Sequence, residues 1–393
     1  MANTATPLFS PEGAAVLANV MKPALQASTL PAEAYWSPAV YEREMERIFR
    51  KEWICVGRRE DVPNTGDYFT TTLAGEPLIV ARDESGEIGA FLNVCRHRGC
   101  EVVQGAGNAE RFRCPYHGWL YGLNGELKTT PNFAGVENFD KSKHALHAVK
   151  AEVWEGFIFV NLDRDAEPFA PRVSEMSRWQ FEKYGFGDKE VTHSFSYDIA
   201  ANWKTYVENG MEEYHTPWVH AETLQPFMPM LGWKELTDVS DQPWTVMIGQ
   251  FPGISMSPTG KSLLPIPDSF KDIDPQFDGM PIANIFPNFL IVATPDSMSY
   301  IMVEPTGPET TRVTIRMCLP KEVAAAFRAG DPEATKIAEA YAETIPPFMA
   351  EDNMTAEAQQ RGLRSKLASS GRYCKYEQLA WRFVNWVARK AYI

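Results

Sequence analysis

Two cysteines and two histidines in the first third of the chain have the types and spacing of metal ligands. Cys95 and His97 form one short pair, Cys114 and His117 form a second, and 16 residues (98 to 113) lie between the pairs. Two thiolates can hold one iron of a [2Fe-2S] cluster while two imidazoles hold the other, and neutral imidazoles raise the reduction potential to about −150 to +300 mV. The quartet therefore predicts a cluster that accepts and passes single electrons.

A structural zinc ion is the alternative for the same quartet, because two cysteines and two histidines also suit tetrahedral zinc. Zinc fingers commonly supply a cysteine pair first and a histidine pair later. Here each loop supplies one cysteine and one histidine. This alternation favours the iron-sulfur cluster over zinc.

Carboxylates and imidazoles gather a second time in residues 202–220. On a continuous helix Glu208, Glu212 and His215 fall at positions i, i+4 and i+7 and share one face. Glu213 is rotated by about 100° from that face and is expected to be solvated. The shared face is therefore predicted to be the side of the helix that binds a second metal.

His215 and His220 are five residues apart, which on an unbroken helix separates them by about 140°. Pro217 lacks an amide donor and disfavours helical geometry in the residue before it. A helix that ends or bulges at 216–217 is therefore predicted, since this would turn His220 back toward His215. Two imidazoles and one carboxylate form the facial triad of non-haem Fe(II) sites, which leaves positions open for O2 and water. The segment thus predicts a mononuclear Fe(II) centre whose third ligand comes from elsewhere.

Short strands must position the first quartet. Glu84-Ser85-Gly86 and Asn124-Gly125 are turn signals between apolar runs. Strands are predicted at 76–83, 89–94, 118–123 and 156–162. These elements make a small all-β domain over 46–165, preceded by a helical lead-in at 1–45.

Residues 166–393 are predicted to form a larger domain of mixed composition. Helical stretches follow Pro168 and Pro171, and a segment rich in Pro, Met and Phe follows at 225–290. Strands are then predicted at 298–305 and 310–319, and helices at 331–345, after Pro346-Pro347, and at 377–393. The fold class of the whole chain is predicted as α+β.

The overall composition excludes several classes of function. The chain has 393 residues and a formal net charge of −13, which argues against nucleic acid as a partner. No apolar run approaches the roughly 20 residues of a membrane helix, and the first residues lack the pattern of a signal peptide, so a cytoplasmic protein without membrane contact is expected. Six cysteines are too few and too scattered for a disulfide framework. The four outside the quartet are expected as buried thiols: Cys55, Cys100, Cys318 and Cys374.

The residues CRHRG at 95–99 and CPYHGW at 114–119 resemble the Rieske family. Respiratory members of that family carry a further cysteine in each loop, and this chain has Tyr116 at the second of those places, which points away from the respiratory branch. The pattern NWK…EN…E-x-Y-H-x4-H at 202–220 is similar to the catalytic iron motif of Rieske non-haem iron oxygenases. The resemblance covers nearly the whole chain.

The resemblance implies a role for each acidic and imidazole residue of the second cluster. By position His215 and His220 would bind the iron. Glu212 would bridge the cluster and the iron of adjacent subunits; this residue is usually Asp, and Glu occurs in the branch that oxidises carnitine and betaine-like quaternary amines. The segment at 346–363 resembles the C-terminal Asp segment of the family, with Glu357 five residues after Asp352 and Gln-Arg-Gly-Leu following at 360–363. This third-ligand motif selects Asp352 as the third ligand, with Glu351 as its rival.

The resemblance also implies an architecture and an assembly. The N-terminal all-β Rieske [2Fe-2S] domain would be followed by a helix-grip catalytic domain of the START/Bet v1-like kind, with an antiparallel sheet around a pocket. The assembly would be a homotrimer. Candidate pocket walls lie in 223–300, and they are Phe227, Met228, Met230, Phe251, Met256, Phe286 and Phe289, with Trp233 and Trp244 as possible members of an aromatic cage for a cationic nitrogen.

The resemblance implies the terminal oxygenase component of an aromatic-ring-hydroxylating or N-demethylating system. No strand-GxGxxG-helix pattern is present, so electrons must come from a separate NAD(P)H-dependent reductase or ferredoxin. Its docking site would be the arginines that flank the cluster loops: Arg96, Arg98, Arg111 and Arg113. Monooxygenation of an organic substrate, by hydroxylation or N- or O-dealkylation, is the leading expectation. The alternatives are a cis-dihydroxylating dioxygenase and a Rieske electron carrier.

Overall fold

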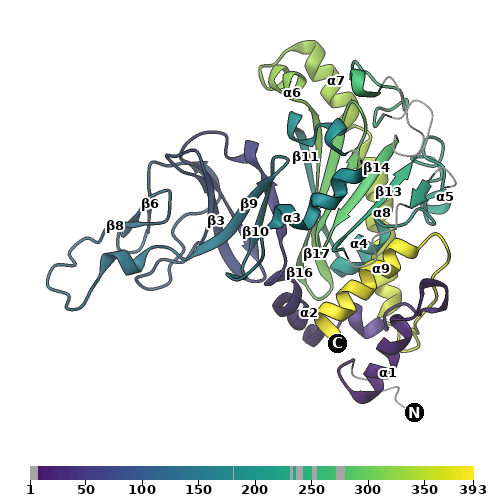
Figure 1. Ribbon diagram of the computed structural model, residues 1–393, viewed down its shortest axis with the longest axis horizontal. Helices are drawn as coiled ribbons and strands as arrows, with labels where there is room; N and C mark the ends of the chain where they lie inside the picture. Colours follow the sequence, from purple (N-terminus) through teal and green to yellow (C-terminus); the bar gives the residue numbers. More distant parts are fainter. Residues whose placement is uncertain (1–7, 180, 231–232, 236–241, 250–254, 271–278) are drawn as a thin grey trace. The chain divides into compact units, whose positions relative to one another are not determined.

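The computed structural model describes residues 8–179, 181–230, 233–235, 242–249, 255–270 and 279–393 (Figure 1). Two compact units divide the chain, residues 49–170 and residues 1–48 with 171–393. The helical lead-in predicted at 1–45 therefore belongs to the same unit as residues 171–393. No helix among the described residues is both long enough and apolar enough to cross a membrane.

The unit at 49–170 contains two antiparallel sheets. Its larger sheet comprises β1 (Ile54–Arg58), β2 (Asp67–Leu73), β3 (Glu76–Arg82), β4 (Ile88–Leu92), β5 (Ala106–Asn108), β9 (Ala148–Trp154) and β10 (Phe157–Asn161), in the order β1-β10-β9-β4-β3-β2-β5. The smaller sheet comprises β6 (Phe112–Arg113), β7 (Leu120–Tyr121) and β8 (Leu127–Thr129). The predicted turn between β3 and β4 forms at Gly86, whose φ of 89° suits glycine, while Asp83 accepts the amide N–H of Ser85 at 2.8 Å.

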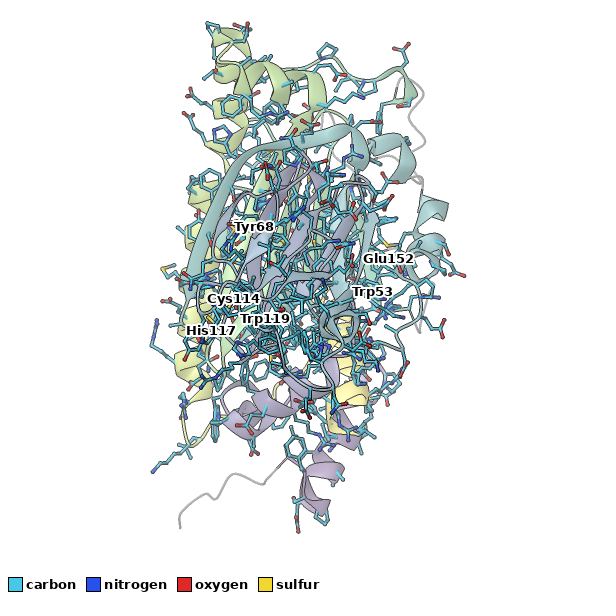
Figure 2. All side chains as sticks on the ribbon, turned by 90° about the vertical axis from the view of Figure 1, so that its left-hand side faces the viewer. Trp53, Tyr68, Cys114, His117, Trp119 and Glu152 are labelled. Carbon is cyan, nitrogen blue, oxygen red and sulfur yellow. The ribbon has the colours of Figure 1, made fainter. Side chains whose placement is uncertain are left out.

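Aromatic residues form the core beneath the predicted cluster loops. Phe112, Trp119 and Tyr121 are at most 2% exposed and belong to one apolar cluster with Cys95 and Cys114. Figure 2 shows Trp119 beside Cys114 in this unit. Large buried rings supply much apolar area per residue, so this core is expected to hold the loops in place.

A seven-stranded antiparallel sheet is the centre of the other unit. Its strands are β11 (Lys189–Ile199), β12 (Trp233–Glu235), β13 (Trp244–Gly249), β14 (Met280–Ile285), β15 (Phe289–Ala293), β16 (Met298–Gly307) and β17 (Thr310–Pro320), in the order β11-β17-β16-β15-β14-β13-β12. The strands predicted at 298–305 and 310–319 correspond to β16 and β17. Strand β11 was not predicted, because its alternating half-buried residues follow two prolines that suggested only helices.

Helices accompany this sheet. They are α1 (Pro11–Val20), α2 (Pro38–Glu44), α4 (Trp203–Asn209), α5 (Thr216–Val219), α6 (Lys321–Arg328), α7 (Pro332–Ala342), α8 (Ile345–Leu363) and α9 (Gln378–Val387), and the short α3 (Phe169–Val173) lies where the two units join in the sequence. Helices α6 and α7 contact β11 and β17 at the upper end of the sheet in Figure 1, whereas α4 contacts β16, α8 and α9. The predicted α+β class is confirmed.

A fully buried ion pair joins helix α2 to helix α4. Lys204 Nζ donates to Glu44 Oε1 at 2.6 Å, and neither side chain is exposed. Glu44 also accepts the indole N–H of Trp203 at 2.8 Å and the hydroxyl of Tyr392. Residues from the beginning, middle and end of the chain therefore meet at one polar cluster.

Candidate active site

The two cluster loops repeat one backbone turn. The carbonyl of Cys95 accepts the amide N–H of Gly99 at 2.9 Å, and the carbonyl of Cys114 accepts that of Gly118 at 3.0 Å. Both glycines have positive φ, 77° and 72°, which other residues rarely adopt. Each loop therefore needs its glycine to turn back after the cysteine and bring the histidine beside it.

The side chains of the four predicted cluster ligands converge within this unit. Cys95 and Cys114 are buried, and the His97 and His117 ring centroids lie 4.7 Å apart. Burial raises the pKa of the Cys95 thiol, and a hydrogen bond with the Cys114 thiol adds to the rise. His97 Nδ1 is buried without a hydrogen-bond partner, which is costly unless a metal occupies its lone pair. The donor set therefore fits a [2Fe-2S] cluster.

Aromatic contacts hold the outer side of this site. Trp119 stacks on His97 with ring centroids 4.9 Å apart, and Tyr116 is 55% exposed beneath the Arg98 guanidinium, which lies 5.5 Å from its ring centroid. Arg96 donates to the carbonyl of Ala145 at 3.0 Å. Arg98, Arg111 and Arg113 are exposed, so the loop arginines present positive charge to solvent.

Two of the cysteines outside the quartet differ from expectation. Cys55 and Cys318 are buried, but Cys100 and Cys374 are partly exposed, and none of the four forms a disulfide. Cys100 follows directly on Gly99, where the turn brings the chain to the surface.

The predicted helix break lies in a different place. Helix α4 ends at Asn209, residues 210–215 form turns, and α5 begins at Thr216 with Pro217 in its first turn. The prediction of a break at 216–217 was therefore wrong. A proline is well tolerated in the first turn of a helix, where its missing N–H has no partner to lose.

His215, His220 and Asp352 meet in spite of this difference. His220 Nε2 lies 3.0 Å and His215 Nε2 lies 3.8 Å from Asp352 Oδ1. One ligand atom from each of the three residues lies within 4.8 Å of the other two. Asp352 reaches the histidines from α8, more than 130 residues along the chain. Two imidazoles and one carboxylate fit the ligand set of a non-haem iron.

A carboxylate orients each imidazole from its other nitrogen. His215 Nδ1 lies 2.7 Å from Glu212 Oε1, and His220 Nδ1 lies 2.7 Å from Glu351 Oε2. Such partners fix the tautomer and the ring orientation, which leaves Nε2 free for a metal. Glu351, the rival third ligand, thus contacts Nδ1 of His220, while Asp352 lies on the Nε2 side of both histidines.

The surrounding carboxylates favour positive charge at this point. Burial lowers the pKa of His215, but the hydrogen bond to Glu212 and the nearby carboxylates outweigh burial and raise the pKa to about 9. For His220 the hydrogen bond to Asp352 likewise outweighs burial and raises the pKa. The site thus favours positive charge, which a divalent metal ion would supply.

Glu208 and Glu213 do not occupy the predicted positions. Glu208 Oε1 accepts the hydroxyl of Tyr35 at 2.8 Å, and Glu208 is not in the group of described ligand atoms that His215, His220 and Asp352 form. Glu213 is partly buried, accepts the hydroxyl of Thr216 at 2.7 Å and lines a cavity, so the expectation of a solvated Glu213 was wrong. Burial raises the pKa of each carboxyl to about 7. The early end of α4 explains both differences, because helical spacing no longer applies after Asn209.

The raised pKa of Glu208 predicts a pH-dependent stability. Its folded pKa of about 7 lies above the ordinary value of 4.5, so between these values the native state binds more protons than the unfolded state. Stability therefore falls as pH rises through this window. Urea unfolding of Glu208→Gln at pH 5 and pH 8 is expected to show a smaller fall than the wild type, by up to about 3 kcal/mol. An equal fall in both proteins would contradict this assignment.

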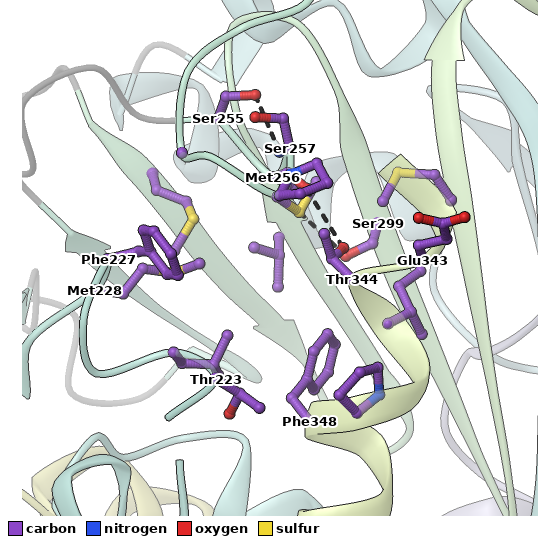
Figure 3. A pocket seen from close by; sticks show the side chains of 18 of the residues that line it. Thr223, Phe227, Met228, Ser255, Met256, Ser257, Ser299, Glu343, Thr344 and Phe348 are labelled. Carbon is purple, nitrogen blue, oxygen red and sulfur yellow. Dashed lines mark hydrogen bonds between the residues drawn. The ribbon is translucent and has the colours of Figure 1, made fainter. Parts of the chain in front are cut away.

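A cavity of about 390 Å³ lies in the unit that carries the histidine-carboxylate triad. Its lining residues are Glu213, Thr223, Leu224, Phe227, Met228, Ser255, Met256, Ser257, Pro258, Gly260, Met280, Ile282, Val292, Ser299, Met317, Glu343, Thr344, Ile345, Pro347 and Phe348. Phe227 and Met228 face Glu343 across the cavity, and Phe348 lies on its lower side (Figure 3). The ring centroid of Phe348 lies 6.5 Å from that of His220, so the cavity adjoins the triad.

The sequence identified some of these walls. Phe227, Met228 and Met256 line the cavity as predicted. Met230 does not, and Phe286 and Phe289 instead line a smaller hollow of about 50 Å³ that includes Asp352. Trp244 is a buried core residue that donates to the carbonyl of Arg172 at 3.2 Å, while Phe251 and the side chain of Trp233 lie outside the described residues.

Several cavity residues were not predicted from the sequence. For one of them, the sequence contained a pattern that could have identified it. Phe348 lies four residues before Asp352 and hence on the same face of α8, so the third-ligand motif could have pointed to it. Glu343 and Met280 had no comparable signal, because their approach to the cavity depends on how the strands and helices are arranged.

The two side-chain clusters and their scaffolds define the class of Rieske non-haem iron proteins. Comparison with family models agrees: residues 52–140 match the Rieske [2Fe-2S] domain, and residues 186–391 match the ring hydroxylating alpha subunit (catalytic domain). The chain belongs to the ring-hydroxylating alpha-subunit family. These domains indicate a Rieske [2Fe-2S] cluster and a mononuclear iron as its cofactors.

Two of the relatives that were found are monooxygenases. The carnitine monooxygenase oxygenase subunit of Acinetobacter baumannii is 33% identical over 223 residues, which is 56% of this chain and 59% of that protein. The chain thus spans less than two thirds of that relative. The chloroplastic choline monooxygenase of Spinacia oleracea is 27% identical over 356 residues, 89% of this chain and 75% of the relative.

Solved structures show the same fold. A quaternary ammonium Rieske monooxygenase is 27% identical, with 93% of this chain and 96% of that chain covered and a TM-score of 0.79. Naphthalene 1,2-dioxygenase from Rhodococcus sp. has a TM-score of 0.76 at 22% identity, with 91% and 93% covered. The second likeness establishes the fold alone.

Proposed function

We propose that this chain is a terminal oxygenase component that uses O2 and externally supplied electrons to monooxygenate a quaternary amine. The observation that carries the proposal is the convergence of His215, His220 and Asp352 beside a largely apolar cavity of about 390 Å³. The similarity to carnitine and choline monooxygenases supports the substrate class. A pure electron carrier would have no use for this triad.

The chain's own residues have distinct parts in this proposal. Cys95, His97, Cys114 and His117 hold the cluster, and His215, His220 and Asp352 hold the iron. When bound, the cluster supplies single electrons and the iron activates O2. Glu212 and Glu351 keep the two imidazole rings in the orientation that presents Nε2. The apolar cavity walls hold the substrate beside the triad and exclude water from it.

Electrons have to reach the iron from outside the chain. We assign to Glu212 the bridge between the cluster of one subunit and the iron of its neighbour in a homotrimer, on the strength of its hydrogen bond to His215 and the family resemblance. A separate NAD(P)H-dependent reductase or ferredoxin supplies the electrons, and we place the reaction in the cytoplasm, where reduced nicotinamide is available.

Isotope labelling tests the proposed function. With 18O2, NADH, a Rieske-oxygenase reductase and choline or L-carnitine, and with the reaction quenched in borohydride so that an aldehyde product is reduced before its oxygen exchanges with water, the expected result is label at no more than one oxygen atom in each product molecule. Two labelled atoms in a cis-diol from an aromatic substrate would favour the dioxygenase alternative. A failure to incorporate label from O2 into any amine or aromatic compound would contradict the proposal.

Charge reversal at the cluster loops tests where the electron donor docks. Arg98→Glu and Arg111→Glu are expected to raise the KM for an acidic donor about tenfold at low salt and to leave kcat at saturating donor unchanged, because exposed charges chiefly affect encounter. Added salt should reduce the difference between variant and wild type. Lys336→Glu, an exposed residue of α7, is the control that should change neither value. Unchanged KM in the arginine variants would place the docking site elsewhere.

A further inference from the structure

The hydroxyl groups that line the cavity have their hydrogens committed to other protein groups. Thr223 donates to Glu351 at 2.6 Å, Ser255 to Asp296 at 2.7 Å, and Thr344 to the carbonyl of Tyr341 at 2.7 Å. Each hydroxyl has one hydrogen to donate. These three groups can therefore accept a hydrogen bond from a ligand but cannot donate one.

Of the two remaining serine hydroxyls, one follows the same pattern and one does not. Ser257 donates to the carbonyl of Lys261, and Ser299 faces the sulfur of Met256 at 3.6 Å. A thioether is a weak acceptor, so Ser299 is the single lining hydroxyl whose hydrogen is loosely held. No lysine, arginine or histidine is among the described residues that line the cavity.

The helix that begins at the cavity has fewer amide donors than usual in its first turn. The first amides of a helix usually form an anion site, because their N–H groups have no partner within the helix. At the start of α8 two successive residues are prolines, Pro346 and Pro347, and these have no N–H. Glu343 precedes this first turn and lines the cavity. An anionic group would therefore find little to bind there.

Acidic side chains and aromatic rings line the same space. Glu213 and Glu343 place carboxyl groups on the wall, and Phe227 and Phe348 place rings there. Glu343 is exposed, and burial raises the pKa of Glu213 to about 7, so Glu213 is fully ionised only above that pH. A third carboxylate, Asp296, lies directly behind Ser255, and the side chains that donate to it are neutral hydroxyls, which include Tyr341. Carboxylates and ring faces both attract an organic cation.

We propose that the cavity selects an organic ammonium ion that carries no acid group, and that it disfavours zwitterions such as carnitine. This inference rests on the proposed function for its location and goes beyond it in the charge of the substrate. Among the described side chains that line the cavity, a carboxylate would find only the hydroxyl of Ser299 as a hydrogen-bond donor, and an ionised group that loses its water without gaining hydrogen bonds is strongly disfavoured. A hydroxyl-bearing cation such as choline has no such penalty, because its O–H can donate to the lining oxygens.

Calorimetric titration of the holoenzyme, kept anaerobic and without reductant, tests the proposal by binding rather than turnover. The three probes are choline, its neutral isostere 3,3-dimethylbutan-1-ol, and L-carnitine. Choline is expected to bind at least about tenfold more tightly than the isostere, because only choline gains from the carboxylates and rings. It is also expected to bind at least about tenfold more tightly than L-carnitine, because the carboxylate of L-carnitine is left without donors.

A matched pair of variants tests the counter-charge. Glu343→Gln is expected to weaken the binding of choline about threefold and to leave the affinity for the isostere unchanged, because one charge is lost at the cavity wall. Glu333→Gln removes an exposed carboxylate of α7 that does not line the cavity. This variant should change neither the affinity for choline nor the affinity for the isostere.

Three results would overturn the inference: L-carnitine binding as tightly as choline, the isostere binding as tightly as choline, or no binding of any probe at millimolar concentration. The labelling experiment separates this failure from failure of the proposed function. Oxygenation of L-carnitine with equal binding of the probes would leave the function standing and reject the charge selectivity. Selective choline binding without incorporation of label would support the charge selectivity and reject the proposed function.

Discussion

Exchanging Asp352 for asparagine is expected to remove the mononuclear iron and leave the cluster intact. The substitution keeps the shape of the side chain but removes the negative charge that lies 3.0 Å from His220 Nε2. Iron content should fall from about three to about two atoms per chain, since the cluster holds two. Amine oxygenation should fall at least about 100-fold, the scale on which even outer partners of metal ligands alter affinity. Metal analysis, with the visible and EPR spectra of the cluster, measures both outcomes.

The neighbouring residue supplies the matched control. Glu351→Gln keeps an oxygen near His220 Nδ1, 2.7 Å away in the wild type, and removes only the charge behind the ring. This variant is expected to keep iron at saturating Fe(II) and to bind it about 10- to 100-fold more weakly. If Glu351→Gln lost all iron and Asp352→Asn retained it, the assignment of the third ligand would be reversed.

Replacing Lys204 by methionine is expected to lower the free energy of unfolding by about 3–5 kcal/mol, because it leaves the carboxylate of Glu44 buried without its cation. Both side chains are completely buried, so water cannot compensate for the loss. The polar side chains around Glu44 join α2 to α4 and to Tyr392 near the C-terminus. The loss of stability should therefore reach the whole unit that carries the histidine-carboxylate triad. The urea midpoint, followed by tryptophan fluorescence, measures the change.

A double variant separates the cost of an unpaired charge from the cost of lost packing. Lys204→Met combined with Glu44→Gln removes both charges and keeps an acceptor for Trp203 and Tyr392. It should recover at least about 1 kcal/mol relative to Lys204→Met alone. A double variant less stable than Lys204→Met alone would show that the loss of stability comes from lost packing around Glu44 and Lys204, and not from the unpaired charge.

The parts of the site that depend on local spacing could be predicted from the sequence. The loop pairs at 95–97 and 114–117 carry their own glycine turns, and so their convergence follows from short segments. His215 and His220 are also near neighbours along the chain. Asp352 is far away in sequence, and only the resemblance to a known family pointed to it.

The parts that depend on the arrangement of distant elements could not be predicted. Helical spacing placed Glu208 on the metal face and Glu213 in solvent, and both placements failed because α4 ends at Asn209. No local pattern brings Glu343 to the cavity or Glu44 to Lys204. These contacts arise from tertiary packing, which a periodicity within one segment cannot show.

Anomalous diffraction at the iron edge, from crystals of the protein as isolated, would locate both metal centres in one experiment. We expect a pair of iron atoms among Cys95, His97, Cys114 and His117, and a separate single iron among His215, His220 and Asp352. A zinc edge at the first site, or no metal held jointly by the two histidines and Asp352, would contradict this expectation.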